Sequence, residues 1–203
     1  GQKQAAWRTD PARSGAGGAI GDIGTHAYNM ACFVSGLEAE SLCADLSSYV
    51  EGRRLDDNAQ VMLRYPDGVR GMLWASQVAP GNEINLMVRI YGEKGGLSWR
   101  KEDPICLTWA PLGEAPRRIT RGGPGSDGNA GRVTRIPAGH PEGYLEAFST
   151  IYSEVAEAIL AARGHRTAGQ DVMFPTGEDG VKGVRFVEAV VESSRANSAW
   201  VVL

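Results

Sequence analysis

The sequence lacks the features that mark several classes of protein. Its 203 residues include no apolar run of the roughly 18 residues that a membrane-spanning helix needs. No run of lysine and arginine could neutralise a row of phosphates, and the formal net charge of −3 argues against a nucleic-acid partner. The first residues, GQKQAAWRTD, lack the apolar segment of a signal peptide, so we expect a soluble, cytoplasmic protein.

Zinc ligands are scarce, with three cysteines and three histidines in the whole chain. The cysteines are Cys32, Cys43 and Cys106. They form no C-x-x-C pair, so we expect reduced, buried thiols. A metal site built from Asp22, His26 and His140 would take two ligands from one helix and has no marked fourth ligand, so we predict no metal.

What is present favours one α+β domain over residues 1–203. Residues 1–19 are polar, glycine-rich and interrupted by Pro11, which predicts an extended opening segment. Apolar residues then recur with helical spacing over 20–34, and Gly36 follows as a stop signal. On this helix the apolar face is predicted to pack on the core.

The middle of the chain, residues 38–120, alternates as strands do, with a hairpin signal at Pro66-Asp67-Gly68. Consecutive strands with tight turns imply antiparallel pairing. A glycine- and arginine-rich loop is expected over 121–139, followed by two amphipathic helices, the second opening at Thr176, and a closing strand in SAWVVL. The predicted fold is a largely antiparallel, open-faced sheet with helices packed on one face.

The best candidate for chemistry is the segment GDIGTH. Asp22 and His26 stand four residues apart, so both side chains fall on one helical face, where a carboxylate can orient an imidazole that takes a proton from an alcohol. Asn29 continues the same stripe. The alternative is a helix-capping aspartate and a histidine at the edge of the core. Glycines before the helix would allow close approach, and the helix N-terminus would attract negative charge.

Other motifs are weaker. GPGSDG at 123–128 matches a dinucleotide fingerprint letter for letter, but a proline interrupts it and no helix is expected after it, which favours a surface loop. His140 lies between glycine and proline, where a ligand-facing imidazole and a loop histidine without a role remain equal alternatives. Trp74 with Gln77 is a combination that binds sugars, although core packing of Trp74 is the favoured interpretation. The charged cluster at 53–57 is interpreted as a solvated turn.

Several of these motifs occur together in the order and spacing of one family. They are WRTDPARSGAGGAIGDIGTHAYNMACFVSG, LDDNAQVMLRYPDGVRGMLWASQ, IYGEKGGLSW, IPAGHPEGYLEAFSTIY and FPTGEDGVKGVRFVEAVVESS. Over nearly its whole length the chain resembles the C-terminal domain of the Gfo/Idh/MocA family (glucose-fructose oxidoreductase / inositol dehydrogenase). Members pair a Rossmann domain with an α+β domain whose open sheet commonly mediates dimers and tetramers.

The resemblance implies an NAD(P)-dependent dehydrogenase of sugars, cyclitols or related polyols. His26 would take the hydroxyl proton, and Asp22 would hold a neighbouring hydroxyl or the imidazole. Asn29 stands where many members carry a second aspartate. Arg13, His140 and Trp74 are sugar contacts by position, so the implied substrate-binding residues are Arg13, Asn29, Trp74 and His140.

The resemblance also implies a missing half. The Rossmann domain is absent, and with it the lysine that the family supplies from a Glu-Lys-Pro motif, so NAD or NADP would be bound mainly outside this chain and the cofactor-binding residues are unknown. We therefore expect the substrate-binding and oligomerisation half of an oxidoreductase, inactive as this fragment alone. The alternative is a non-catalytic module of the same fold that senses carbohydrate or assembles a partner.

Overall fold

The computed structural model describes residues 7–126, 128–165, 167 and 172–203. Within the chain, residues 1–83 and 177–203 form one compact unit, and residues 84–176 form another. The fold class is α+β with antiparallel strands, as the sequence predicts, but the strands form two four-stranded sheets rather than the single sheet expected, because tight turns predict antiparallel pairing without showing where one sheet ends. That the two units act as one domain over 1–203 stays a prediction.

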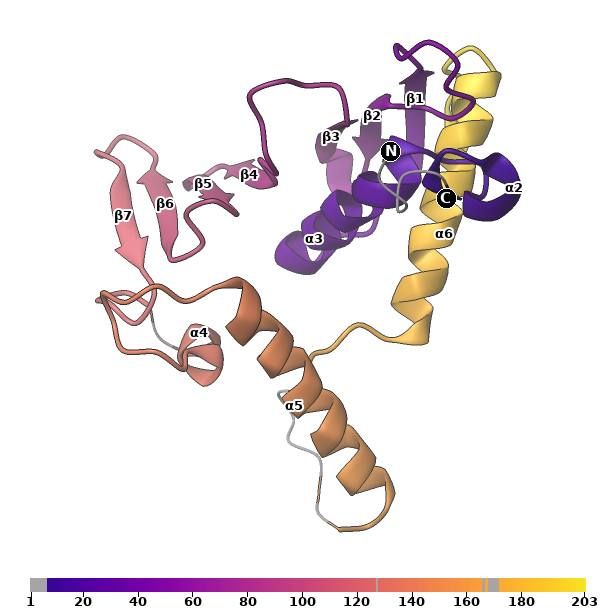
Figure 1. The fold of residues 1–203 in the computed structure, drawn as a ribbon. Coiled ribbons are helices and arrows are strands. Elements are labelled where there is room, and N and C mark those ends of the chain that lie inside the picture. The colour runs from indigo at the N-terminus through magenta and orange to yellow at the C-terminus, as the bar shows by residue number, and fades with distance from the viewer. Residues whose placement is uncertain (1–6, 127, 166, 168–171) are drawn as a thin grey trace. The chain divides into compact units, whose positions relative to one another are not determined.

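The first unit is a four-stranded antiparallel sheet in the order β3-β2-β1-β8. Its strands are β1 (Ser41–Ser47), β2 (Asn58–Arg64), β3 (Arg70–Ser76) and β8 (Val201–Val202). Its helices are α2 (Pro11–Ser14), the π-helix η1 (Ile20–Gly24), α3 (Thr25–Ser35) and α6 (Gly177–Arg195). Figure 1 shows α3 and α6 beside the strands β1 to β3. The helix over 20–34, its stop at Gly36 and the closing strand are confirmed.

The core of this unit lies between the helices and one face of the sheet. Along β2 buried and exposed residues alternate, so Val61 and Leu63 face the helices while Met62 faces away. From the helix side, Tyr28 of α3 stacks on Phe186 of α6 with ring centroids 4.0 Å apart and planes 2° from parallel. This stacked pair joins α3 to α6 above the sheet.

The turn between β2 and β3 is the predicted hairpin. It is formed by a 3-10 turn, η2 (Pro66–Gly68), in which Asp67 and Gly68 both have positive φ, at 56° and 78°. Aspartate tolerates the left-handed region and glycine adopts it without cost, so this dipeptide closes the hairpin. The register that follows pairs Gln60 with Trp74 and Met62 with Met72.

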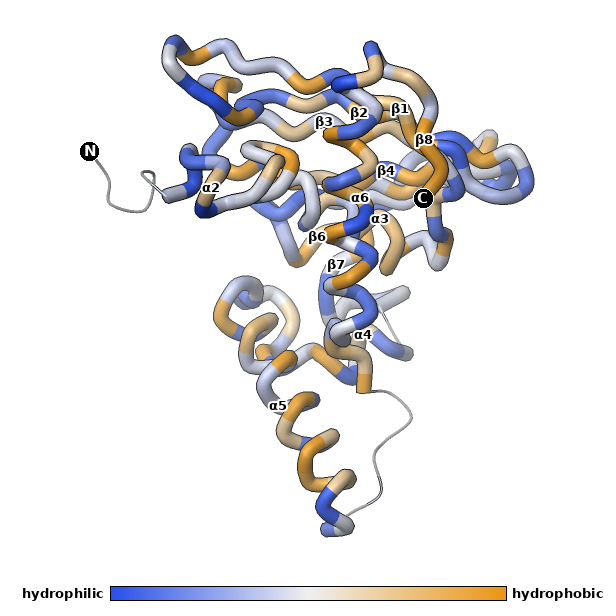
Figure 2. The backbone as a smooth tube through the Cα atoms, turned by 90° about the vertical axis from the view of Figure 1, so that its right-hand side faces the viewer, coloured by the Kyte–Doolittle hydropathy of each residue, from blue (hydrophilic) through white to orange (hydrophobic). Residues whose placement is uncertain are grey.

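The second unit contains an antiparallel meander in the order β4-β5-β6-β7. Its strands are β4 (Met87–Gly92), β5 (Gly95–Arg100), β6 (Cys106–Pro111) and β7 (Arg117–Thr120). Its helices are α4 (Asn129–Val133) and α5 (Tyr144–Ala162). Apolar residues recur along α5, as orange segments in Figure 2 show. None of the described helices is long and apolar enough to cross a membrane.

Two segments expected without helix contain short helices. The helix α2 lies inside the predicted extended segment, because Pro11 occupies its first turn, where a missing N–H costs nothing, and the Asp10 carboxylate accepts a bond from the Ala12 N–H at 3.1 Å. The five-residue helix α4 lies inside the predicted loop 121–139. Its single turn is too short to produce a periodic pattern in the sequence.

The apolar stripes of the last two helices are only partly buried. On α6, Val181 and Val184 are exposed, whereas Val187 and Val191 of the predicted apolar stripe pack inward beside Phe186 and Val190. On α5, Leu145 and Tyr152 are exposed although they belong to the predicted stripe. Helical periodicity identifies the apolar face of a helix but not the length over which a neighbour covers it.

Candidate functional site

The helix that carries Asp22 and His26 begins against a buried carboxylate. The Asp56 carboxylate accepts bonds from the backbone N–H of Gly18 at 2.5 Å and of Ile20 at 2.8 Å, and the Ala19 N–H donates to the Asp56 carbonyl at 2.8 Å. The approach is so close that a Cβ on Gly18 would lie 2.0 Å from that carbonyl oxygen. The negative charge expected at this helix start is therefore supplied by Asp56.

The interpretation of residues 53–57 as a solvated turn is wrong for both aspartates. Asp56 is 8% exposed and Asp57 is 0% exposed. The Asp57 carboxylate accepts bonds from the backbone N–H groups of Tyr49 and Val50, each at 2.9 Å. Backbone donors replace water around both carboxylates, and these donors cannot be seen in the local charge pattern.

We expect Asp56→Ala to lower the free energy of unfolding by about 1–2 kcal/mol, because the substitution removes a helix cap and leaves the buried Ile20 N–H without an acceptor. The measurement is urea unfolding of the protein. Asp45→Ala, at an exposed position on β1, is the matched control and is expected to change stability by less than about 0.5 kcal/mol. Equal effects of the two substitutions would contradict the capping role.

A π-helical turn places Asp22 and His26. In η1 the Thr25 N–H donates to the Ile20 carbonyl, five residues back, and α3 follows without a break. Such turns occur frequently at functional sites. The Asp22 side chain is 29% exposed, and His26 and Asn29 on α3 are exposed. Neither Asp22 nor His26 is sealed in the core, which argues against a merely structural histidine at the core edge.

The Asp22 side chain contacts two residues, and neither of them is His26. Its Oδ2 accepts bonds from Arg8 Nη1 at 3.4 Å and from Gln77 Nε2 at 3.2 Å. Across the described ranges no hydrogen bond or ion pair involves the His26 side chain. The predicted orientation of the imidazole by Asp22 is thus not found, and His26 presents a free imidazole to solvent.

Gln77 belongs to a longer chain of polar contacts. Its Oε1 accepts from Arg53 Nη1 at 3.0 Å, and the same guanidinium lies 3.8 Å from a carboxylate oxygen of buried Asp57. Sequence reasoning paired Gln77 with Trp74 instead and missed Arg8 and Arg53. Arg53 and Asp57 carry opposite charges four residues apart, and this spacing could have predicted their contact. No pattern in the local sequence links Gln77 to Asp22.

Trp74 lies on the opposite face of the sheet. It is 60% exposed, and its Nε1–H donates to Asn58 Oδ1 at 2.8 Å, so the interpretation as a core residue is wrong. Because side chains alternate along β3, Leu73 and Ala75 face the helices while Trp74 faces away from them. Within this unit the structure does not bring Trp74 to Asp22 and His26. Arg13 is exposed on α2.

His140 lies in the second unit, on an exposed loop held by a buried ion pair. Arg121 Nη1 and Glu142 Oε2 are 2.6 Å apart, and the two side chains are only 15% and 5% exposed. The guanidinium also donates to three loop carbonyls, those of Ile136, Pro137 and His140. Glu142 in turn accepts from the N–H of Arg135 at 2.7 Å. The loop that presents His140 is therefore fixed at both ends.

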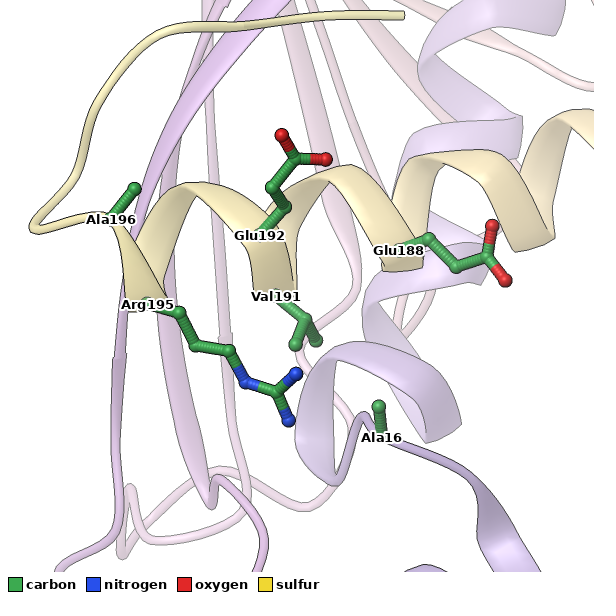
Figure 3. Close-up of a pocket in the computed structure, with 6 residues that line it drawn as sticks. All are labelled: Ala16, Glu188, Val191, Glu192, Arg195 and Ala196. Carbon is green, nitrogen blue, oxygen red and sulfur yellow. The ribbon is translucent and has the colours of Figure 1, made fainter.

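A cavity of about 450 Å³ lies elsewhere in the first unit, between α6 and Ala16. Figure 3 shows the Arg195 side chain extending from α6 toward Ala16. The polar residues of its lining are Glu188, Glu192 and Arg195, and none of the predicted site residues is among them. No group of three or more metal-ligating side chains is close enough to hold an ion within the described residues.

Two segments that the sequence offered for a phosphate or another anion are unsuited to one. The fingerprint-like segment 123–128 is followed by the five-residue helix α4, too short for a phosphate site, and the helix start at Ile20 is already occupied by the Asp56 carboxylate.

Comparison with known proteins agrees with this fold. Residues 1–98 match the GFO/IDH/MocA C-terminal domain model. The chain is 33% identical over 198 residues to the uncharacterized oxidoreductase YfiI of Bacillus subtilis, spanning 96% of this chain and 50% of that protein. It therefore belongs to the Gfo/Idh/MocA family, and the resemblance seen in the sequence is confirmed.

Solved structures show the same relationship. An oxidoreductase from Sinorhizobium meliloti is 57% identical with a TM-score of 0.85, over 90% of this chain and 52% of that one. An inositol dehydrogenase homolog from Azotobacter vinelandii, complexed with NADH and myo-inositol, is 30% identical with a TM-score of 0.90, over 99% of this chain and 52% of that one. The chain spans about half the length of the relatives that it matches.

Proposed function

We propose that this chain is the substrate-binding half of an NAD(P)-dependent oxidoreductase that oxidises a sugar, a cyclitol or a related polyol. The observation that carries the proposal is the exposed His26 imidazole, one helical turn from a carboxylate that is held in place by Arg8 and Gln77. Membership of the family and the myo-inositol bound to the Azotobacter relative support a polyol as the substrate.

In this proposal the two side chains have separate tasks. His26 accepts the proton of the reacting hydroxyl as general base, because its imidazole is exposed and has no other partner among the described residues. Asp22 accepts a hydrogen bond from a neighbouring hydroxyl and so fixes the ring. The nicotinamide, held by the other half of the longer protein, would supply the hydride acceptor.

The remaining candidates are proposed contacts of lower rank. Asn29 follows His26 by one turn, so its amide is proposed to bind a further hydroxyl. Arg13 and His140 remain proposed sugar contacts. Trp74 would have to act across a subunit boundary, because it lies on the uncovered face of the sheet together with exposed Met62 and Met72. We propose that this face joins copies of the protein into an oligomer.

The test is nucleotide reduction by the full-length protein that contains this chain. With NAD⁺ or NADP⁺ and a panel that includes myo-inositol, absorbance at 340 nm should rise with at least one polyol, whereas residues 1–203 alone should give no signal. Turnover by the isolated chain would contradict its assignment as one half of the site. Calorimetric binding of a polyol to the full-length protein without turnover would contradict the enzyme and favour the sensing module.

A further inference from the structure

The two oxygens of the Asp22 carboxylate are in different environments. Arg8 and Gln77 both donate to Oδ2, at 3.4 and 3.2 Å. No donor to Oδ1 is found in the part of the chain that the structure describes. Since each carboxylate oxygen can accept two hydrogen bonds, one oxygen is held by the protein and the other is left open on a partly exposed residue.

The Gln77 amide can satisfy its neighbours in only one orientation. Its Oε1 faces the Arg53 guanidinium and its Nε2 faces the Asp22 carboxylate. A flipped amide would place its oxygen against the carboxylate and its NH₂ group against the guanidinium, and both contacts would be repulsive. The opposite charges on the two sides therefore fix the amide, and the amide in turn fixes Oδ2.

The Arg53 guanidinium is itself anchored in the core of the unit. Asp57 is fully buried, its carboxylate is held by the backbone N–H groups of Tyr49 and Val50, and it lies 3.8 Å from Arg53 Nη1. The Gln77 N–H also donates to the Asp57 carbonyl at 2.8 Å. The contacts thus run from the buried Asp57 through Arg53 and Gln77 to Asp22 at the surface.

We propose that Gln77 is a positioning residue for Asp22. Oriented by Arg53, it holds Oδ2 and thereby aims Oδ1 at a hydroxyl of the bound polyol. The inference rests on the proposed function for the substrate, whereas the contact between Gln77 and Asp22 stands independently of it. Gln77 touches no reacting atom, so its effect must pass through Asp22.

The kinetic test uses Gln77→Met in the full-length protein, a substitution of similar length that removes both polar groups at an exposed position. We expect kcat/KM for the oxidised polyol to fall about tenfold. In the Asp22→Asn background, the same substitution should have less than a twofold effect, because residues that act through one another are not additive. Arg54→Met, on an exposed arginine next to Arg53, is the control and should leave kcat/KM unchanged, whereas Arg53→Met should reproduce part of the Gln77→Met loss.

A second measurement detects the hydrogen bond between Gln77 and Asp22 independently of enzymatic activity. In the full-length protein labelled with ¹⁵N-glutamine, the Gln77 side-chain NH₂ signals, assigned by their loss in Gln77→Met, should shift in Asp22→Asn and not in Asp45→Asn. If no polyol is oxidised but these signals shift, the proposed substrate fails and the contact stands. Unmoved signals, or a Gln77→Met loss that is equally large without the Asp22 carboxylate, would overturn the inference.

Discussion

Replacing His26 with alanine in the full-length protein is expected to lower kcat by a factor of about 10² to 10⁴, the usual contribution of a general base. The imidazole is exposed, and across the described residues it makes no hydrogen bond or ion pair, so its loss should not disturb the fold. The readout is the rate of nucleotide reduction at saturating polyol, together with the urea midpoint of the variant.

The control for this prediction is His165→Ala, which removes another exposed histidine, one that lies just after α5. It should leave kcat unchanged. Added imidazole should restore part of the activity of His26→Ala and none in a variant that also lacks the Asp22 carboxylate. A kcat within about twofold of the wild type would remove His26 from the role of base.

Replacing Glu142 with alanine is expected to lower the free energy of unfolding by about 3 kcal/mol, because removal of one partner from a buried ion pair leaves an uncompensated charge. Arg121 would keep its carbonyl partners but lose the carboxylate that lies 2.6 Å from its Nη1, and the Arg135 N–H would lose its acceptor. The measurement is urea unfolding of the full-length protein, with hydrogen exchange of residues 134–143 to show that the loop carrying His140 has loosened.

The same unit offers a matched control. Glu114 and Arg117 also form an ion pair, but their side chains are 55% and 60% exposed. Glu114→Ala should therefore change stability by less than about 1 kcal/mol, as is usual for ion pairs at the surface. Similar losses of stability in Glu114→Ala and Glu142→Ala would show that burial does not increase the contribution of the Arg121–Glu142 ion pair to stability. Protection of residues 134–143 that survives Glu142→Ala would show that the loop is fixed in another way.

Local periodicity was enough to predict most elements of the fold. The helix over 20–34, the hairpin at Pro66-Asp67-Gly68 and the meander over 87–120 each follow from a repeat or a turn signal only a few residues long. The same reasoning placed Asp22 and His26 on one helix outside the core. It failed where a signal was too short, as in α4, or where burial depends on a neighbour, as on α5 and α6.

The sequence by itself therefore determined the family, the elements and the helix that carries the candidate site. Only the tertiary structure decided what surrounds that site. Asp56 reaches the helix start from 38 residues away, and Gln77 reaches Asp22 from 55 residues away. Such partners are brought together by chain folding, whereas a local pattern records only the spacing of residues along one element. This is why the aspartates of the charged turn at 53–57 looked solvated in the sequence, whereas in the structure Asp56 holds the start of the helix and Asp57 lies beside Arg53.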